Sequence, residues 1–284
     1  MLTLVLTRHG LTDRSEPEQH LGQRIDISLN AAGTRQAQVL GRRLAPVRFD
    51  RVITSPLFRA RETAALLARG VPVEADPRLR EMDYGDWEGR TYADIQAFDG
   101  ARRRDWEQAP ELIPCPGGES GNDVAKRVQA FLVDVLEEHA RREARAAFRA
   151  SVGMSDTPGT SGIRERTAML PPLAAPEPRP RPGSVRSAPS DLPPLRRSAP
   201  PPTPAAPAGP PDRPILVVAH ATTNRILLCV ALGVAMRDFR RRFVQGQANV
   251  TVLRWDAGAG PEDATLELLN DIEHLRSATE APWT

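Results

Sequence analysis

Two histidines directly follow short apolar segments, which places an imidazole at each of two predicted strand ends. His9 comes after residues 2–7 and His220 after residues 215–219, and both segments have the length and β-prone composition of buried strands. In α/β proteins, ligands bind at the edge of the sheet where the parallel strands end. An imidazole at that edge can attack an electrophile or move a proton. Each histidine taken alone could equally be a structural cap or a core residue.

Arg59 lies in the first turn of a predicted helix. A predicted strand over residues 51–54 passes almost directly into this helix, which spans residues 57–69. Unpaired backbone N–H groups and the helix dipole make such a first turn favourable for an anion. Arg61 is two positions further on and points to a different face of the helix. The alternative is that both arginines are solvated helix charges.

Residues 79–89 combine acids, aromatics and glycines without regular periodicity. Segments of this kind are usually surface loops, and such loops often carry function. The candidate acids in it are Glu81, Asp83, Asp86 and Glu88. Their spacing does not choose among them. The alternative is a hydrophilic loop that Tyr84 and Trp87 hold in place.

Short apolar segments alternate with helical patterns along most of the chain. The clearest helix is predicted from Val124 to about Phe148, where apolar residues recur at helical spacing. Further helices are predicted from Asn30 to Pro46, over 57–69 and over 222–232, with an interrupted helical pattern from Thr91. Strands are predicted at 2–7, 51–54, 71–74, 215–219, 250–255 and 265–269. This alternation predicts an α/β fold with an open, mostly parallel sheet and helices on both faces.

The distribution of proline divides the chain of 284 residues, of which 40% are hydrophobic and 26% charged. Eighteen of the 28 prolines lie within residues 158–214, where apolar residues are too sparse to offset chain entropy. We therefore expect one domain in two segments, 1–150 and 214–275, interrupted by a disordered, partly polyproline insertion at 151–213 and followed by a flexible tail at 276–284. The alternative to a solvated insertion is one whose prolines dock weakly into an aromatic groove of a partner.

Charge and cysteine content exclude several classes of protein. Eight basic and four acidic residues lie in 158–214, which leaves 30 basic and 32 acidic residues elsewhere and a formal charge of −2 there. We therefore expect no nucleic-acid partner, and interpret the runs Arg102–Arg104 and Arg240–Arg242 as solvated surface. Two cysteines cannot form a disulfide framework, and the N-terminus does not resemble a signal peptide, so we expect a cytoplasmic protein. The longest apolar run, residues 226–236, is too short to span a bilayer, and we expect no membrane partner.

Four motifs, taken in order, resemble those of a known family. They are Arg8-His9-Gly10 after a strand, Ser55-Pro56-Leu57-Phe58-Arg59-Ala60 at a helix start, Glu81 in a Leu-Arg-Glu-x-x-x-Gly-x-x-Glu-Gly segment, and His220 after a late strand. Supporting matches are Gly22-x-x-x-Asp26, residues 29–37, Gly117-Gly118-Glu119-Ser120 and residues 249–253. The ordered set resembles the phosphatase branch of the histidine phosphatase superfamily, which has the phosphoglycerate mutase-like fold. The resemblance covers both sides of the Pro-rich stretch, from about residue 2 to residue 255.

The resemblance implies a role for each motif residue. His9 would be the nucleophile that becomes phosphorylated, and Glu81 the proton donor. The phosphate pocket would be formed by Arg8, Arg59 and His220. Fixed cations around the equatorial oxygens stabilise the transition state of phosphoryl transfer, and the planar fork of arginine suits this task. A carboxyl near the leaving oxygen can donate a proton and then activate water. This mechanism needs no metal ion and no other cofactor.

Three positions depart from the usual pattern of the family. Family members commonly have Glu and Asn where this chain has Leu11 and Ser15, and Gly where it has Ala221. Ser15 and Ala221 are the corresponding candidates for binding the substrate phosphate. A Cβ at Ala221 restricts the turn if a backbone N–H there has to approach phosphate. The hydroxyl of Thr222 could compensate.

The predicted function is that of a metal-independent phosphomonoester hydrolase that forms a phosphohistidine and acts on a small phosphorylated metabolite. A short loop after Arg59 and the Asp86-Trp87-Glu88-Gly89 ending favour a phosphatase, and the sequence shows no clear equivalent of the extra cationic contacts that mutases use. One alternative is a cofactor-dependent phosphoglycerate mutase. The other is a non-catalytic protein that senses phosphate or recruits a partner through its prolines.

Overall fold

The computed structural model describes residues 1–151 and 213–276. Its strands are β1 Leu2–Arg8, β2 Arg51–Thr54, β3 Val73–Ala75, β4 Ile215–Ala219, β5 Val250–Trp255 and β6 Thr265–Asp271. Its α-helices are α1 Ala31–Arg43, α2 Phe58–Leu67, α3 Tyr92–Gln108, α4 Gly121–Ser151, α5 Ala221–Ala231 and α6 Phe239–Arg242. The predicted insertion at 151–213 and tail at 276–284 lie outside the described residues, apart from their first or last positions.

The described strands form one sheet in the order β3-β2-β4-β1-β5-β6. Parallel pairing joins β3, β2, β4 and β1, while β5 pairs antiparallel with β1 and β6 antiparallel with β5. The prediction of a mostly parallel sheet is therefore confirmed. β4 lies between β1 and β2 although it follows them by more than 150 residues in the sequence, so the parts of the chain before and after the insertion share a single sheet.

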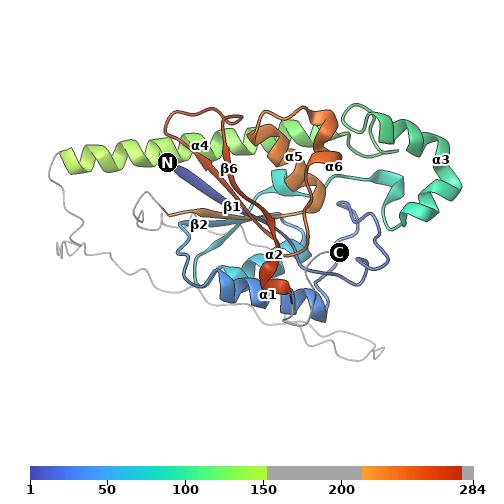
Figure 1. Ribbon diagram of the computed structural model, residues 1–284, viewed down its shortest axis with the longest axis horizontal. Coiled ribbons are helices and arrows are strands. Elements are labelled where there is room, and N and C mark those ends of the chain that lie inside the picture. The colour runs from blue at the N-terminus through green and yellow to red at the C-terminus, as the bar shows by residue number, and fades with distance from the viewer. Residues whose placement is uncertain (152–212, 277–284) are drawn as a thin grey trace, which may run out of the picture. The chain divides into compact units, whose positions relative to one another are not determined.

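Two hydrophobic layers cover the sheet because successive side chains of a strand point to opposite faces. In β4, Ile215, Val217 and Ala219 pack into one layer, which includes the apolar faces of α4 and α5. Leu216 and Val218 pack into the second layer, which includes the apolar faces of α1 and α2. Figure 1 shows α4 and α5 on one side of the sheet and α1 and α2 on the other. Helices on both faces confirm the predicted fold class.

Several elements differ from the pattern predicted from the sequence. The interrupted helical region becomes α3, which kinks at Asp99, where the backbone leaves helical geometry (φ −138°, ψ 34°). A capping box between Thr91 and Asp94 begins this helix. The short helix α6 was not predicted, because four residues are too few to show helical periodicity. No helix among the described residues is long and apolar enough to cross a membrane.

Candidate active site

The two strand-end histidines lie side by side because β1 and β4 are parallel neighbours. Arg8 is paired with Ala219 across the two strands, and the backbone N–H of His9 donates to the carbonyl of Ala219 at 3.1 Å. The next residue on each strand is therefore a histidine, and the ring centroids of His9 and His220 are 5.1 Å apart. Both side chains are buried. The sheet thus assembles a pair of imidazoles from residues 211 positions apart.

His9 is held in one tautomer. Its Nδ1 lies 2.7 Å from the carbonyl oxygen of Gly10, and a carbonyl only accepts, so Nδ1 carries the proton. The lone pair is therefore on Nε2. Burial, followed by the nearby guanidinium groups of Arg59 and Arg8, lowers the pKa of His9 well below its usual range. His9 is consequently neutral at neutral pH, with Nε2 available as a nucleophile.

Close backbone packing positions the turn that follows His9. A Cβ added at Gly10 would lie 2.5 Å from the carbonyl oxygen of Gly33, and one added at Gly33 would lie 2.0 Å from the carbonyl oxygen of Leu11. Any larger side chain at either position would force α1 away from this turn. The N–H of Gly10 also donates to the hydroxyl of Thr63 on α2 at 3.2 Å. Gly33 belongs to the supporting match at residues 29–37, and that segment therefore supports the position of His9.

Arg59 is completely buried, so the alternative of a solvated helix charge is wrong for this residue. Its guanidinium donates to the carbonyls of Ile25, Leu21 and Gly22 at 3.1, 3.1 and 2.9 Å. It thereby fastens the loop that precedes Asp26. After burial, the charge of Arg59 is the next largest cause that lowers the pKa of His9 and His220, because it lies close to their rings. One side chain thus carries a structural contact and a positive charge next to His9.

The loop whose carbonyls bind Arg59 is also held through its backbone N–H groups. The Glu88 carboxylate accepts hydrogen bonds from the N–H groups of Gln23, Arg24 and Ile25 at 2.8, 2.9 and 3.1 Å. A guanidinium therefore satisfies carbonyls of this loop while a carboxylate satisfies its amides. Glu88 therefore has a structural role, because both of its carboxylate oxygens bind this loop.

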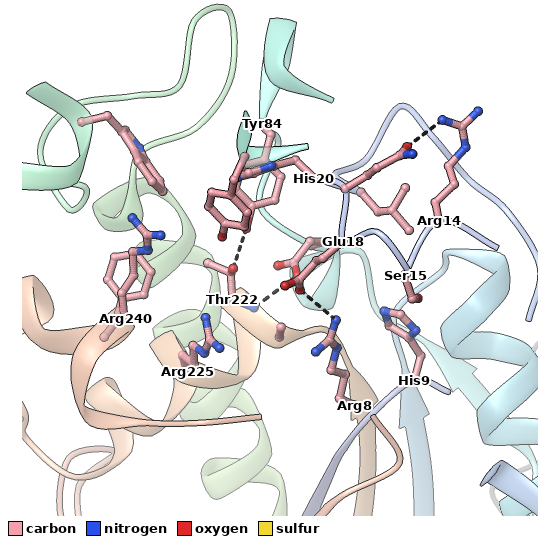
Figure 2. A pocket seen from close by; sticks show the side chains of 17 residues that line it. Arg8, His9, Arg14, Ser15, Glu18, His20, Tyr84, Thr222, Arg225 and Arg240 are labelled. Carbon is pink, nitrogen blue, oxygen red and sulfur yellow. Dashed lines mark hydrogen bonds and ion pairs between the residues drawn. The ribbon is translucent and has the colours of Figure 1, made fainter. Parts of the chain in front are cut away.

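Arg8 contributes a second cation beside His9. Its Nη1 donates to the carbonyl of Gln245 at 3.0 Å, and its Nη2 lies 3.7 Å from a carboxylate oxygen of Glu18. The Nε atom is buried and has no hydrogen-bond partner within the described chain. Figure 2 shows the Arg8 guanidinium pointing into a cavity, with Glu18 across from it. Arg8 therefore retains donor capacity toward the cavity.

His220 is completely buried and is not among the residues that line the cavity. Its Nε2 is 2.7 Å from the hydroxyl of Ser55, at the end of β2, whereas its buried Nδ1 has no partner within the described chain. Burial and the charge of Arg59 lower the pKa of His220 well below its usual range. The ring is therefore neutral at neutral pH.

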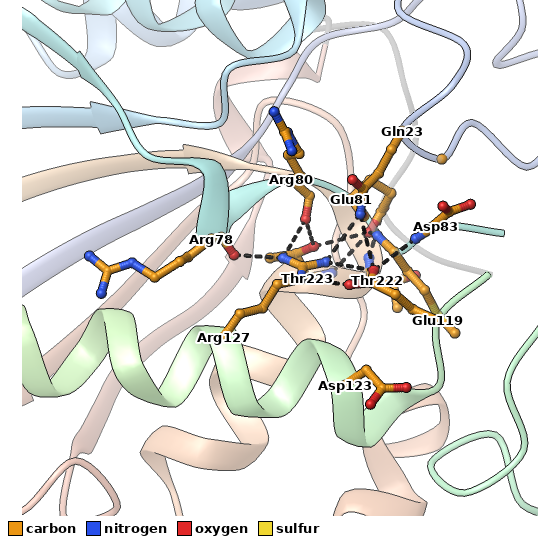
Figure 3. Close-up of polar contacts among 12 residues, drawn as sticks. Gln23, Arg78, Arg80, Glu81, Asp83, Glu119, Asp123, Arg127, Thr222 and Thr223 are labelled. Atoms are coloured by element: carbon orange, nitrogen blue, oxygen red, sulfur yellow. Dashed lines mark hydrogen bonds and ion pairs between the residues drawn. The ribbon is translucent and has the colours of Figure 1, made fainter. Parts of the chain in front are cut away.

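Glu81 occupies the N-terminus of α5. One carboxylate oxygen accepts a hydrogen bond from the N–H of Thr222 at 3.1 Å, and the other accepts from the N–H groups of Thr223 and Met82 at 3.1 and 2.9 Å. Figure 3 shows Arg127 of α4 holding the segment before Glu81. Its guanidinium donates to the carbonyls of Arg78, Arg80 and Glu81 at 2.6, 2.8 and 3.2 Å.

The four candidate acids have different surroundings. Glu81 lines the cavity that contains His9. Asp83 accepts from the N–H of Gly85 in its own turn, and Asp86 is largely exposed. Glu88 fastens the neighbouring loop. The structure therefore places one of the four against the cavity, a choice that spacing did not make.

Ser15 and Ala221 both line the cavity. The Ser15 hydroxyl accepts from the N–H of Thr12 at 3.0 Å and lies 3.1 Å from the Thr12 hydroxyl. Ala221 begins α5 and is not among the described residues with a positive φ, so its Cβ causes no strain there. The Thr222 hydroxyl lies 2.6 Å from that of Tyr84, and this contact occupies the group that could compensate for a missing glycine.

The cavity extends beyond His9 and is lined by residues that the sequence did not mark as functional. Among these are Glu18, His20, Tyr92, Trp106, Arg225 and Arg240. The interpretation of Arg240–Arg242 as solvated surface is wrong for one member of the run. Arg241 and Arg242 are exposed, but Arg240 is half-buried, with its guanidinium 4.5 Å from the ring centroid of Trp106. The spacing in the sequence could have indicated Arg225, because it lies three residues after Thr222 and therefore on the same face of the helix. The described residues contain no cluster of three or more His, Cys, Asp or Glu side chains that could hold a metal ion.

Comparisons with solved structures match this fold. The alpha-ribazole phosphatase from Shigella flexneri superimposes with a TM-score of 0.62 at 22% identity, covering 95% of this chain and 96% of the other. A mycobacterial glucosyl-3-phosphoglycerate phosphatase in complex with inorganic phosphate gives a TM-score of 0.61 at 25% identity, covering 96% and 99%. The first likeness concerns the fold alone.

Sequence comparisons match about half of the chain to curated phosphatases. Fructose-2,6-bisphosphatase TIGAR of Xenopus tropicalis is 35% identical over 150 residues, which are 49% of this chain and 53% of that protein. Glucosyl-3-phosphoglycerate phosphatase of Mycobacterium tuberculosis is 37% identical over 139 residues, 47% of this chain and 60% of that protein. The chain thus spans little more than half the length of these relatives. The model of the histidine phosphatase superfamily (branch 1) matches residues 4–148 and 204–271, so the chain belongs to that superfamily.

Proposed function

We propose that this protein hydrolyses phosphomonoesters of small metabolites through a phosphohistidine at His9, without a metal ion. The observation that carries the proposal is the state of His9: a neutral imidazole whose Nδ1–H is bound by Gly10, which leaves Nε2 free beside two guanidinium groups. Membership of the superfamily and likeness to named phosphatases support the same reaction. The domain that carries it comprises residues 1–150 and 214–275.

In the first step, the Nε2 lone pair of His9 attacks phosphorus and the bond from phosphorus to the ester oxygen breaks. In the proposed site, Arg8 faces the transferring group from the cavity wall, while the buried side chains of Arg59 and His220 lie next to His9. The two guanidiniums compensate the charge on the equatorial oxygens of the group. Glu81, in its protonated form, gives its proton to the leaving oxygen, so that the product leaves as an alcohol.

In the second step, water attacks the phosphorus of phosphohistidine. Glu81 is now a carboxylate and accepts the proton of the attacking water, while the bond between Nε2 and phosphorus breaks and inorganic phosphate is released. The contacts of Glu81 with the start of α5 keep its carboxyl group in place for both proton transfers. Ser15 and the N–H of Ala221 are proposed as further phosphate contacts, since both residues line the cavity.

The proposal is tested by steady-state hydrolysis of p-nitrophenyl phosphate and of a panel of phosphorylated metabolites. His9→Gln should abolish phosphate release, while His139→Gln, a histidine on α4 outside the cavity, should retain it. Activity should persist in EDTA. Loss of activity in EDTA that returns with a divalent ion would contradict the metal-independent mechanism.

Two further assays separate the proposal from its alternatives. Interconversion of phosphoglycerates in the presence of bisphosphoglycerate, at a rate exceeding hydrolysis, would identify a mutase instead. A phosphate-sensing protein would bind phosphate or vanadate and release none from any ester. If the protein only senses phosphate, replacing its gene with the His9→Gln variant should leave the cellular function unchanged. If the protein is a phosphatase, the same replacement should abolish that function.

A further inference from the structure

Three hydrogen bonds join Arg8 to one short segment, residues 245–249, which directly precedes β5. The backbone N–H of Arg8 donates to Oδ1 of Asn249 at 2.9 Å, and its carbonyl accepts from the N–H of Ala248 at 2.9 Å. The Arg8 guanidinium donates through Nη1 to the carbonyl of Gln245 at 3.0 Å. The segment 245–249 therefore determines both where the backbone of Arg8 lies and in which direction its guanidinium points.

Ala248 adopts a backbone conformation that residues other than glycine rarely adopt. Its φ is 49°, in the left-handed region, and the residue is completely buried. Such a conformation costs free energy and persists only where the surroundings fix it. Here the N–H of Ala248 is bound by Arg8, and its carbonyl accepts from Nε2 of His274 at 2.9 Å. The strained residue thus lies directly against a residue of the proposed active site, where strain of this kind is commonly found.

The side chain of Gln245 fixes this segment from within the core. The residue is buried, and its amide group makes four hydrogen bonds. Oε1 accepts from Nδ2 of Asn224 at 3.3 Å and from Nδ2 of Asn249 at 3.1 Å. Nε2 donates to the carbonyl of Val244 at 3.0 Å and to the hydroxyl of Thr251 at 3.3 Å. These bonds use both acceptor and both donor positions of the amide, so its orientation is fixed.

Four buried side chains form an amide cluster: Asn224, Gln245, Asn249 and Thr251. The last two belong to the sequence match at residues 249–253, to which the proposed function gives no role. Buried amides add little net stability, because each bond replaces a bond to water, whereas a well-connected cluster permits one arrangement. The amide cluster therefore specifies geometry, and the geometry is that of residues 245–249.

Gln245 reaches the reaction only through Arg8. Gln245 is not among the residues that line the cavity, whereas Arg8 lines it and points into it (Figure 2). The Glu18 carboxylate lies 3.7 Å from Arg8 and its side chain is 61% exposed, so it holds the guanidinium more weakly than the carbonyl of Gln245 does at 3.0 Å. A shift of residues 245–249 would therefore move the guanidinium as well.

We propose that Gln245 is a positioning residue for phosphoryl transfer: its amide group fixes residues 245–249, which in turn aim the Arg8 guanidinium at the transferring phosphoryl group. The inference rests on the proposed function, in which Arg8 compensates the charge of that group. Preorganised donors stabilise a transition state only when they are already aimed at it, and a displacement of about 1 Å can cost about 10²-fold in rate. Gln245 itself takes part in no proton or phosphoryl transfer.

Gln245→Met tests the proposal, because it keeps the length of the side chain and removes its four hydrogen bonds. The kcat for p-nitrophenyl phosphate should fall by about 10- to 100-fold in protein whose circular dichroism shows it to be folded. Trp255→Phe is the matched control, because it removes a buried hydrogen bond, to the carbonyl of Pro261, at the far end of β5. It should keep the wild-type kcat. A wild-type kcat in folded Gln245→Met would overturn the proposal.

A double-mutant cycle shows whether Gln245 acts through Arg8. Gln245→Met is combined with Arg8→Met, and kcat/KM for p-nitrophenyl phosphate is measured for the four proteins. Their affinity for orthovanadate is measured by calorimetry, so that the cycle does not depend on residual activity. Once Arg8 has been removed, Gln245→Met should have no further effect on either quantity. Equal losses with and without Arg8 would overturn the proposal, because they would mean that the amide cluster only supports the fold.

Thr251 offers a second pair of variants. Its hydroxyl accepts from the side chains of Gln245 and Asn249 at 3.3 and 3.2 Å and from the N–H of Asn270 at 3.0 Å. Thr251→Val removes this hydroxyl at nearly constant shape and should also lower kcat, whereas Thr251→Ser keeps the hydroxyl and should restore most of the activity. If Gln245→Met does not fold, this pair decides the question, and equal kcat in the two variants would overturn the proposal.

Hydrolysis of p-nitrophenyl phosphate by the wild-type protein is measured in parallel. Its absence would reject the proposed function itself. Its presence, together with an unchanged kcat in Gln245→Met and Thr251→Val, would reject only the positioning role of Gln245.

Discussion

The buried ring of His20 makes the stability of this protein dependent on pH. The ring lies between Tyr84 and Tyr92, at centroid distances of 4.7 and 4.5 Å, and burial lowers its pKa to about 4. An unfolded chain has an ordinary histidine with a pKa of about 6.5. Between about pH 6.5 and about pH 4, His20 therefore binds a proton in the unfolded chain but not in the folded one. Stability is therefore full above about pH 6.5 and is lost progressively as the pH falls toward 4.

The size of the effect follows from the two pKa values. At about pH 5, this histidine alone lowers the free energy of unfolding by about 2 kcal/mol relative to about pH 7.5. His20→Phe keeps an aromatic ring between the tyrosines and removes the titrating group. The difference in urea-unfolding free energy between the two pH values should therefore shrink by about 2 kcal/mol in this variant.

A second variant, His20→Gln, serves as a control: it also removes the titrating imidazole, but it changes the shape of the side chain. It should show the same reduced pH dependence, although its stability at about pH 7.5 will be lower than that of His20→Phe because the packing between the tyrosines is lost. A pH dependence that both variants share with the wild type would refute the reasoning. It would mean that His20 titrates alike in the folded and unfolded states.

Two further predictions concern the cations beside His9. Arg59→Lys should lower the free energy of unfolding by about 2–4 kcal/mol, because a compact ammonium cannot reach all three carbonyls of residues 21, 22 and 25. Wild-type stability of this variant to urea would contradict that expectation. The variant should also have a kcat for p-nitrophenyl phosphate that is lower by about 10²-fold or more. Glu18→Gln should lower KM by about two- to fivefold at low salt with kcat unchanged, because the Glu18 carboxylate competes with an incoming phosphate for Arg8; a higher KM would show instead that Glu18 helps to bind the substrate.

The meeting of the two histidines was predictable because it depends on simple rules. Each apolar strand ends at a histidine, parallel strands end at the same sheet edge, and β4 completes the sheet next to β1. The burial of Arg59 was less accessible. Its carbonyl partners come from a loop 34 to 38 positions away, and no periodicity connects that loop with α2. The sequence therefore indicated a charge at a helix start without its structural contacts.

The run Arg240–Arg242 shows where reading local sequence fails. It consists of three arginines, and such a run normally indicates solvated surface. The structure contradicts this for one member, because α6 turns Arg240 toward Trp106 and leaves Arg241 and Arg242 exposed. Which member of a charge run faces inward depends on the packing of a four-residue helix, and no local pattern records that. The selection of Glu81 among four acids depends in the same way on α5 and on Arg127.

The measurement that tests the central claim most directly is identification of the phosphorylated residue during turnover. The protein is incubated with excess p-nitrophenyl phosphate, quenched in base, digested and mapped by mass spectrometry. A phosphoryl group should be found on His9, should be lost on brief acid treatment, and should be absent from His9→Gln. An acid-stable phosphate on a serine or threonine, or phosphate release by His9→Gln at the wild-type rate, would contradict the account.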